Sequence, residues 1–152
     1  MRLINESLIL VYSGITRISS DIHKTNKKTI NQSVYNSSLD SISQIADEFS
    51  DCILNHKANL EIFSKYMSES WTAKCNTFPK NDNTSAILEI YRKGISSGAL
   101  CGKLLGAGGG GFFAFFVPKN AQETFVSLMK NYICVSASVS YQGIEKIHHD
   151  NI

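Results

Sequence analysis

A run of glycines near the middle of the second half of the chain constrains its fold more than any other feature. Five of the ten glycines lie within the nine residues from Lys103 to Gly111, and Phe112-Phe-Ala-Phe-Phe-Val117 follows at once. Glycine reaches positive φ without steric cost and lets a ligand or another backbone approach closely. Successive bare N–H groups can also form a concave nest for phosphate. We therefore predict a loop over Gly108–Gly110, with at least one residue at positive φ, followed by a strand.

Two known phosphate-binding patterns fit this run poorly. Gly106-Ala-Gly108-Gly-Gly-Gly111 matches the letters of G-x-G-x-x-G. The dinucleotide fingerprint, however, needs a helix after the loop and an acidic residue about 20 positions on, where this chain has Asn131. The phosphate loop of nucleotide hydrolases needs Lys-Ser/Thr after the last glycine, where this chain has Phe112. Two interpretations stay open: a loop that contacts phosphate, and a loop that only lets two elements pack closely.

The order of a helix, Lys103-Leu-Leu-Gly-Ala-Gly-Gly-Gly-Gly111 and an apolar strand resembles the third conserved motif of the GHMP kinases. A second segment agrees with this resemblance. Leu8–Ile22, with Gly14 and Arg17, looks like the strand-turn-helix that opens the C-terminal half of the sugar kinases in that superfamily. The nearest relatives by this resemblance are the D-glycero-D-manno-heptose phosphate kinases and L-fucose kinase-like proteins.

The resemblance implies that residues 1–152 form a GHMP kinase C-terminal domain, without the N-terminal ATP-binding half. The superfamily's second motif, Pro-x-x-x-Gly-Leu-Gly-Ser-Ser-Ala, begins at neither of the two prolines, Pro79 and Pro118. A complete enzyme would use ATP and Mg²⁺ to phosphorylate a sugar or sugar phosphate. Its partners would be that sugar and the N-terminal kinase half. This chain would bind no cofactor tightly, would be inactive alone, and could self-associate. The alternative is a non-catalytic binding or assembly module, or a remnant of a truncated kinase.

The same resemblance indicates candidate site residues, although catalytic residues stay unassigned. The loop next to the ATP phosphates would comprise Lys103, Gly106, Ala107, Gly108, Gly109, Gly110 and Gly111, and the sugar site would comprise Thr16, Arg17 and Ser19. A guanidinium such as that of Arg17 could hold a sugar phosphate in bidentate fashion, and we expect it within reach of the glycine loop. The residues alone leave other roles open. Lys103 could be a solvated lysine at a helix end, Arg17 could form an internal salt bridge, and the hydroxyls could cap a helix.

Composition limits the remaining possibilities. The length of 152 residues suits one domain, and 43% hydrophobic and 18% charged residues are globular values. A net charge of +2, spread along the chain, gives no reason to expect nucleic acid. Cys52, Cys75, Cys101 and Cys134 show no metal-ligand spacing, so we predict free thiols and no bound metal. No apolar stretch reaches the ~20 residues of a membrane helix, and we expect a cytoplasmic protein.

Hydrophobic periodicity predicts an α+β fold rich in helix. Apolar residues step by three and four across residues 33–53, 60–71 and 86–95, which indicates three amphipathic helices, the first two antiparallel. We expect further helices at 16–24 and 121–131, and strands at 6–13, 112–117, 133–141 and 143–148. Because strands and helices do not alternate regularly, we predict one antiparallel sheet with helices packed on one face. The C-terminal domain of the GHMP kinases has a ferredoxin-like plait of this kind.

Overall fold

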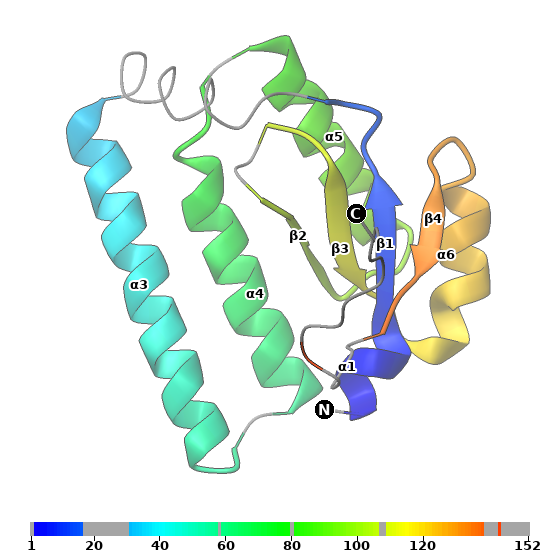
Figure 1. Ribbon diagram of the computed structural model, residues 1–152, viewed down its shortest axis with the longest axis horizontal. Coiled ribbons are helices and arrows are strands. Elements are labelled where there is room, and N and C mark those ends of the chain that lie inside the picture. The colour runs from blue at the N-terminus through cyan, green and yellow to red at the C-terminus, as the bar shows by residue number, and fades with distance from the viewer. Residues whose placement is uncertain are drawn as a thin grey trace, which may run out of the picture.

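A computed structural model describes residues 2–16, 31–57, 59–79, 81–106, 109–138 and 143. Within these residues the elements follow the order α1 (Arg2–Ser7), β1 (Leu8–Tyr12), α3 (Gln32–Leu54), α4 (Leu60–Cys75), α5 (Asp82–Ser96), β2 (Cys101–Leu104), β3 (Phe112–Phe116), the 3₁₀ turn η1 (Lys119–Ala121), α6 (Gln122–Leu128) and β4 (Cys134–Ser136). Figure 1 shows a sheet with α5 and α6 behind it and the α3–α4 pair beside its β2 edge. The predicted helix-rich α+β class is confirmed.

The four strands form one antiparallel sheet in the order β2-β3-β1-β4. In the centre, Leu10 of β1 lies opposite Ala114 of β3, about a hundred residues further along the chain. On its other side β1 pairs with β4, where Leu10 lies opposite Val135. The sheet therefore joins the two ends of the described chain around its central strand.

The main core lies between one sheet face and the helices α5 and α6. Ile9, Val11, Phe113 and Phe115 alternate along β1 and β3 and are almost fully buried, as period-two strands on a covered face should be. Phe115 is held on both sides by glycines. A Cβ at Gly94 of α5 would lie 2.3 Å from the Phe115 ring, and a Cβ at Gly102 of β2 would lie 2.4 Å from it. Glycine at both positions lets the aromatic ring fill the layer between α5 and the sheet.

The α3–α4 pair packs at the β2 edge and onto the opposite sheet face. Phe63 of α4 meets Phe116 of β3 edge to face, with ring centroids 4.6 Å apart, and Met67 joins the same cluster. The two helices run antiparallel, as the short connection predicted (Figure 1). Each of α3, α4 and α5 begins after an asparagine whose side chain accepts a backbone N–H two or three residues on: Asn31, Asn59 and Asn81.

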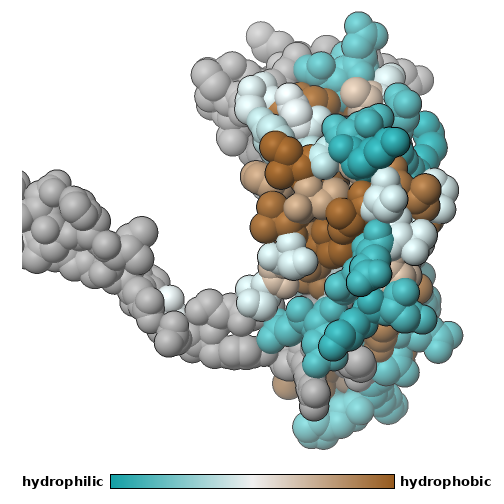
Figure 2. Space-filling view, turned by 90° about the vertical axis from the view of Figure 1, so that its right-hand side faces the viewer, coloured by the Kyte–Doolittle hydropathy of each residue, from teal (hydrophilic) through white to brown (hydrophobic). Residues whose placement is uncertain are grey.

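Hydrophobic residues also gather on the outer side of the β4–α6 region, which Figure 2 faces. Ile133 and Val135 beside β1 are 63% and 47% exposed, and Val126 and Leu128 of α6 are 43% and 51% exposed. This apolar surface borders the sheet rather than filling its core.

Several predicted boundaries were wrong. The strand expected from residue 6 begins only at Leu8, because residues 2–7 form the helix α1. The helix expected at 121–131 ends at Leu128 and continues as a turn. Residues 134–136 form β4, while the rest of the strand expected at 133–141 is either irregular or outside the described residues. The helix expected at 16–24 and the strand at 143–148 also fall largely outside the described residues.

Candidate functional site: the glycine loop and the end of β1

The glycine loop connects β2 to β3 at one end of the sheet. The Leu105 amide donates to the Phe112 carbonyl at 2.8 Å, so the loop leaves and re-enters a hydrogen-bonded hairpin. Gly106, Gly110 and Gly111 have φ of 77°, 145° and 94°. A strand follows at Phe112. The prediction of a loop with positive φ before an aromatic strand is thus confirmed.

The chain that leaves β1 is bonded to the far side of this loop. The Ser13 amide donates to the Gly111 carbonyl at 2.8 Å, and the Gly111 amide donates to the Ile15 carbonyl at 2.8 Å. The Ser13 hydroxyl accepts a hydrogen bond from the Ile15 amide at 3.2 Å, and Ser13 is buried. These bonds continue the β1–β3 pairing past the end of both strands. They hold Ser13 to Ile15 against the glycine loop.

Gly110 has to be glycine because of this contact. A Cβ at Gly110 would lie 2.2 Å from the Ile15 carbonyl oxygen, and the backbone φ of 145° is unfavourable for any other residue. Gly106 and Gly111 differ, since nothing lies within 4 Å of where their Cβ atoms would be. Close packing therefore explains Gly110, one of the two interpretations left open above. At the other two positions the backbone turn requires glycine, and open space lies beside it.

Among the described candidate residues, Thr16 and the loop glycines Gly106 and 109–111 lie together at this end of the sheet. Thr16 is exposed and follows Ile15 directly, so it lies beside the loop. Arg17, Ser19, Ala107 and Gly108 lie outside the described residues, and the proximity of Arg17 to the loop stays a prediction. The sequence did not single out Ser13 and Ile15, whose contacts with the loop are made by the backbone and a buried hydroxyl. Their only signal was a strand end followed by Gly14.

Lys103 lies in a strand, whereas one of the interpretations left open above placed it at a helix end. It belongs to β2 and pairs with Ala114, which places its side chain on the sheet face toward α4. Its Nζ donates to Ser70 Oγ at 2.9 Å. Burial, and then the positive charge of Lys74, lower the pKa of the Lys103 ammonium. The helix-end interpretation is wrong, and the phosphate-contact role stays a prediction.

The loop can position a ligand but carries no proton-transfer group. Residues 104–117 contain no acidic, histidine, cysteine or lysine side chain, so the loop offers only backbone N–H and C=O groups. Among the described residues, no group of three or more histidine, cysteine or carboxylate side chains could hold a metal ion. The four cysteines are free thiols. A catalytic base or a metal ligand at this site would have to come from outside residues 104–117.

Comparisons with known proteins agree with this geometry. No family model matches the chain. A D-glycero-alpha-D-manno-heptose 7-phosphate kinase of Campylobacter jejuni is 26% identical over 124 residues, which cover 80% of this chain and 35% of that protein. The fold is that of the C-terminal domain of the GHMP kinases. The resemblance seen in the sequence motifs is thereby confirmed.

Solved structures show the same fold at low sequence identity. A mevalonate kinase from Methanococcus jannaschii matches 88% of this chain and 40% of its own length, with a TM-score of 0.65 and 19% identity. A D-glycero-D-manno-heptose 1-phosphate kinase from Bacteroides thetaiotaomicron matches 89% of this chain and 33% of its own length, with a TM-score of 0.53 and 18% identity. The chain spans about a third of the length of the curated relative that it matches. In the part that the structure describes, no helix is long and apolar enough to cross a membrane.

Proposed function

We propose that the chain is the C-terminal domain of an ATP-dependent sugar or sugar-phosphate kinase, with a heptose phosphate as the acceptor to test first. One observation carries the proposal: sequence similarity to a heptose 7-phosphate kinase extends over 80% of the chain. The backbone bonds of Ser13 and Ile15 to the glycine loop support it, because they bring together the two segments that resemble sugar kinases. ATP and Mg²⁺ bind mainly to an N-terminal kinase half, and the reaction takes place in the cytoplasm.

The chemistry suits such a division of labour. Phosphoryl transfer depends on positioning and on stabilising charge more than on covalent help from the protein. The glycine loop closes the cleft over the phosphates, and its open positions at Gly106 and Gly111 leave room for them. The other half supplies the helix N-terminus that cradles phosphate. Without that cradle, the 152-residue chain binds ATP with a Kd in the millimolar range or weaker, about 4 kcal/mol of binding free energy.

The test is a coupled assay of ADP release with a panel of sugars and sugar phosphates. We expect no sugar-dependent turnover from this chain alone. We expect turnover when an N-terminal GHMP kinase half is fused or added. Robust turnover by the chain alone would show that the phosphate site lies elsewhere. No turnover with any compatible N-terminal half would favour the non-catalytic module.

A matched pair of glycine variants tests the role of the loop in that reconstituted enzyme. Gly110→Ala forces a methyl group against the Ile15 carbonyl and should lower kcat/KM by at least about tenfold, since small displacements of positioning groups are costly. Gly98→Ala also replaces a glycine at positive φ, 110°, but its nearest neighbour, Ala121 Cβ, lies at 3.8 Å. It should leave kcat/KM within about twofold. Equal losses in both variants would point to general destabilisation.

Exposed apolar side chains support the expectation that the chain associates with a second copy of itself. Ile133, Val135 and Phe112 are each more than a third exposed. Large apolar surfaces of this kind commonly mark contacts with other proteins or domains. We propose that the chain self-associates when no kinase half is present. Sedimentation velocity should show dimers or larger species of the isolated chain, and Ile133→Lys should shift them toward monomer.

A further inference from the structure

The two antiparallel helices α3 and α4 leave a cavity between them and the β2 edge. Although α3 is 23 residues long, Ser38 is its one buried residue, so this helix is the outermost layer of the domain. The cavity measures about 190 Å³. It is lined by Ile42, Ile45, Ala46 and Phe49 of α3, by Phe63, Tyr66, Met67 and Ser70 of α4, and by Lys103 of β2.

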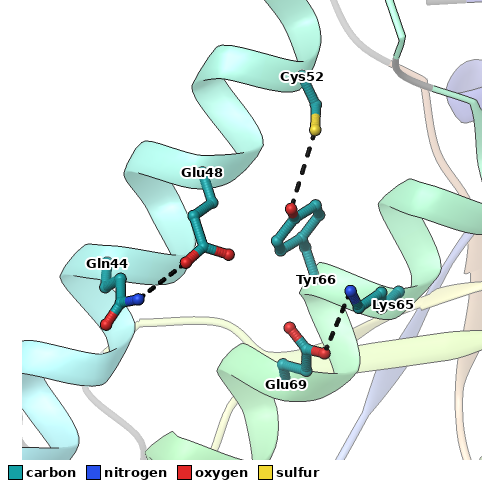
Figure 3. A network of polar contacts seen from close by, with 6 residues as sticks. All are labelled: Gln44, Glu48, Cys52, Lys65, Tyr66 and Glu69. Atoms are coloured by element: carbon teal, nitrogen blue, oxygen red, sulfur yellow. Dashed lines mark hydrogen bonds and ion pairs between the residues drawn. The ribbon is translucent and has the colours of Figure 1, made fainter.

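Aromatic rings hold the walls in place. Phe49 of α3 lies 5.7 Å from the Phe63 ring and 5.6 Å from the Tyr66 ring, both on α4. Tyr66 reaches from α4 toward α3, and its hydroxyl lies 3.8 Å from Cys52 Sγ (Figure 3). Phe63 in turn packs on Phe116 of the sheet. The side walls are therefore apolar and braced from both helices.

One end of the cavity is polar and positively charged. Lys103 Nζ donates one of its three hydrogens to Ser70 Oγ at 2.9 Å. Among the described residues, no carboxylate lies within salt-bridge distance of this ammonium, and the ion pair in α4 joins Lys65 to Glu69. Ser70 is only 8% exposed, and its hydroxyl accepts this bond. Among the described residues, no acceptor lies within hydrogen-bond distance of the Ser70 hydroxyl's own hydrogen. Half-buried charges and buried hydroxyls of this kind normally have partners.

We propose that this cavity is a second binding site, which takes a small monocarboxylate with a compact apolar body. The carboxylate accepts from Lys103 Nζ and from the Ser70 hydroxyl, and the apolar body lies between Phe49, Phe63 and Met67. A dry cavity of about 150 Å³ holds one benzene molecule, so this one suits a ligand of benzoate size. A single ammonium and one neutral hydroxyl match one negative charge better than the two of a phosphate monoester.

This site differs from the glycine loop in chemistry. Residues 104–117 present only backbone polar groups, whereas the cavity combines a cation with aromatic walls. Lys103 lies just before the loop in sequence, but its side chain is directed to α4 by the alternation of β2. The same lysine was a candidate phosphate contact, so the experiment has to separate the two roles.

The experiment measures thermal stabilisation and binding heat of the 152-residue chain with benzoate. At a concentration about tenfold above Kd, benzoate should raise Tm by about 3 °C. Benzyl alcohol, a neutral compound of similar size, should bind at least about tenfold more weakly, since it lacks the charge-assisted hydrogen bond. Inorganic phosphate and ATP should neither raise Tm nor displace benzoate.

Variants locate the site. Lys103→Met should weaken benzoate binding at least about tenfold, while Lys119→Met, at an exposed lysine of η1, should leave it unchanged. If the Lys103 variant fails to fold, Ala46→Phe still tests the proposal, because it fills the cavity from the exposed side of α3. It should abolish binding while far-UV circular dichroism stays the same.

Three outcomes would overturn the proposal. The first is no binding of benzoate at tens of millimolar concentration. The second is equal binding by the wild-type chain and the Ala46→Phe variant. The third is displacement of benzoate by phosphate or ATP, which would place Lys103 in the phosphate site. The first two results leave the kinase assay of the reconstituted enzyme unaffected, whereas the third would assign Lys103 to the phosphate site of the proposed kinase. The two proposals can therefore fail independently.

Discussion

The central strands and the α3–α4 pair flank the same edge strand, β2, yet they are built differently. Around β1 and β3, Val11, Phe113 and Phe115 have no exposed surface, and glycines are required where a ring or a carbonyl approaches. Between α3 and α4, the facing side chains are only partly buried and leave a cavity of about 190 Å³. The sheet region shows how closely backbones and rings can pack where glycine has no side chain. The helix pair shows that amphipathic faces can associate without filling the space between them.

This contrast predicts different dynamics. Segments with few buried apolar contacts open locally at low free energy, and core strands open only with the whole domain. We therefore expect amides of α3 to exchange before those of β1 and β3.

Removing a central ring should distinguish the two regions most clearly. Phe115→Ala should lower the free energy of unfolding by about 4 kcal/mol, because the ring is fully buried between two helices and the sheet. Phe49→Ala should cost only about 1–2 kcal/mol, because that ring is partly exposed and already borders a cavity. Urea denaturation of both variants gives the comparison. Equal losses would mean that the helix pair is as well packed as the sheet.

Adding a methyl group should also be costly near the sheet. Gly94→Ala places a Cβ 2.3 Å from the Phe115 ring, and overpacking of this kind costs about 1–3 kcal/mol even though alanine favours helix. We expect a net loss of about 2 kcal/mol. Ser96→Ala, at an exposed position of the same helix, should change stability by less than about 0.5 kcal/mol. If Gly94→Ala leaves the free energy of unfolding unchanged, the Phe115 ring can shift to a different position without cost.

Alkaline pH should weaken the domain through one buried thiol, Cys101, and one partly buried thiol, Cys75. Burial raises the pKa of Cys101 from 9.0 to about 11, and burial raises the pKa of Cys75 to about 11 as well. Since the folded pKa lies above the unfolded one, this stabilisation is complete below about pH 9 and is lost as the pH rises to about 11. For the fully buried Cys101 we expect a loss on the order of 2 kcal/mol.

The test of this pH dependence compares how steeply the free energy of unfolding falls with pH in the wild-type chain and in a cysteine variant. The free energy of unfolding at a single pH does not decide it. Cys101→Ala should flatten the decline in unfolding free energy between pH 9 and about 11, measured by urea denaturation at each pH. Lys103 acts in the opposite direction, because its pKa is lowered and its deprotonation stabilises the fold as the pH approaches 10.5. An unchanged slope in Cys101→Ala would show that other groups cause the alkaline loss.

The smallest effect should come from the surface of the α3–α4 pair. Lys65 and Glu69 form an ion pair at 3.9 Å with side chains 64% and 44% exposed (Figure 3). Pairs of this kind contribute about 0–0.5 kcal/mol on a helix. Glu69→Ala should therefore leave the midpoint of urea denaturation nearly unchanged. A loss above about 1 kcal/mol would mean that this pair stabilises α4 more than exposed pairs on a helix usually do.

Local periodicity was enough to predict much of the fold. The helices α3, α4 and α5 begin and end within a few residues of the predicted ranges, except that α4 and α5 extend four residues beyond the predicted pattern on one side. Glycine density beside an aromatic run predicted the loop and β3 correctly. Both signals are local, because a 3.6-residue repeat or a glycine run expresses the same preference wherever the chain places it.

Only the tertiary structure decided the rest. Cys101-Gly-Lys-Leu104 is too short and too mixed in polarity to predict a strand, and pairing with β3 makes it one. Once it is a strand, the period of two directs Lys103 toward Ser70 and α4. The contact of Gly110 with Ile15 joins residues nearly a hundred positions apart, so no sequence window contains it. Local sequence patterns were enough for α3, α4, α5, the glycine loop and β3. The packing of distant segments made Cys101–Leu104 a strand, required glycine at position 110 and directed Lys103 toward Ser70.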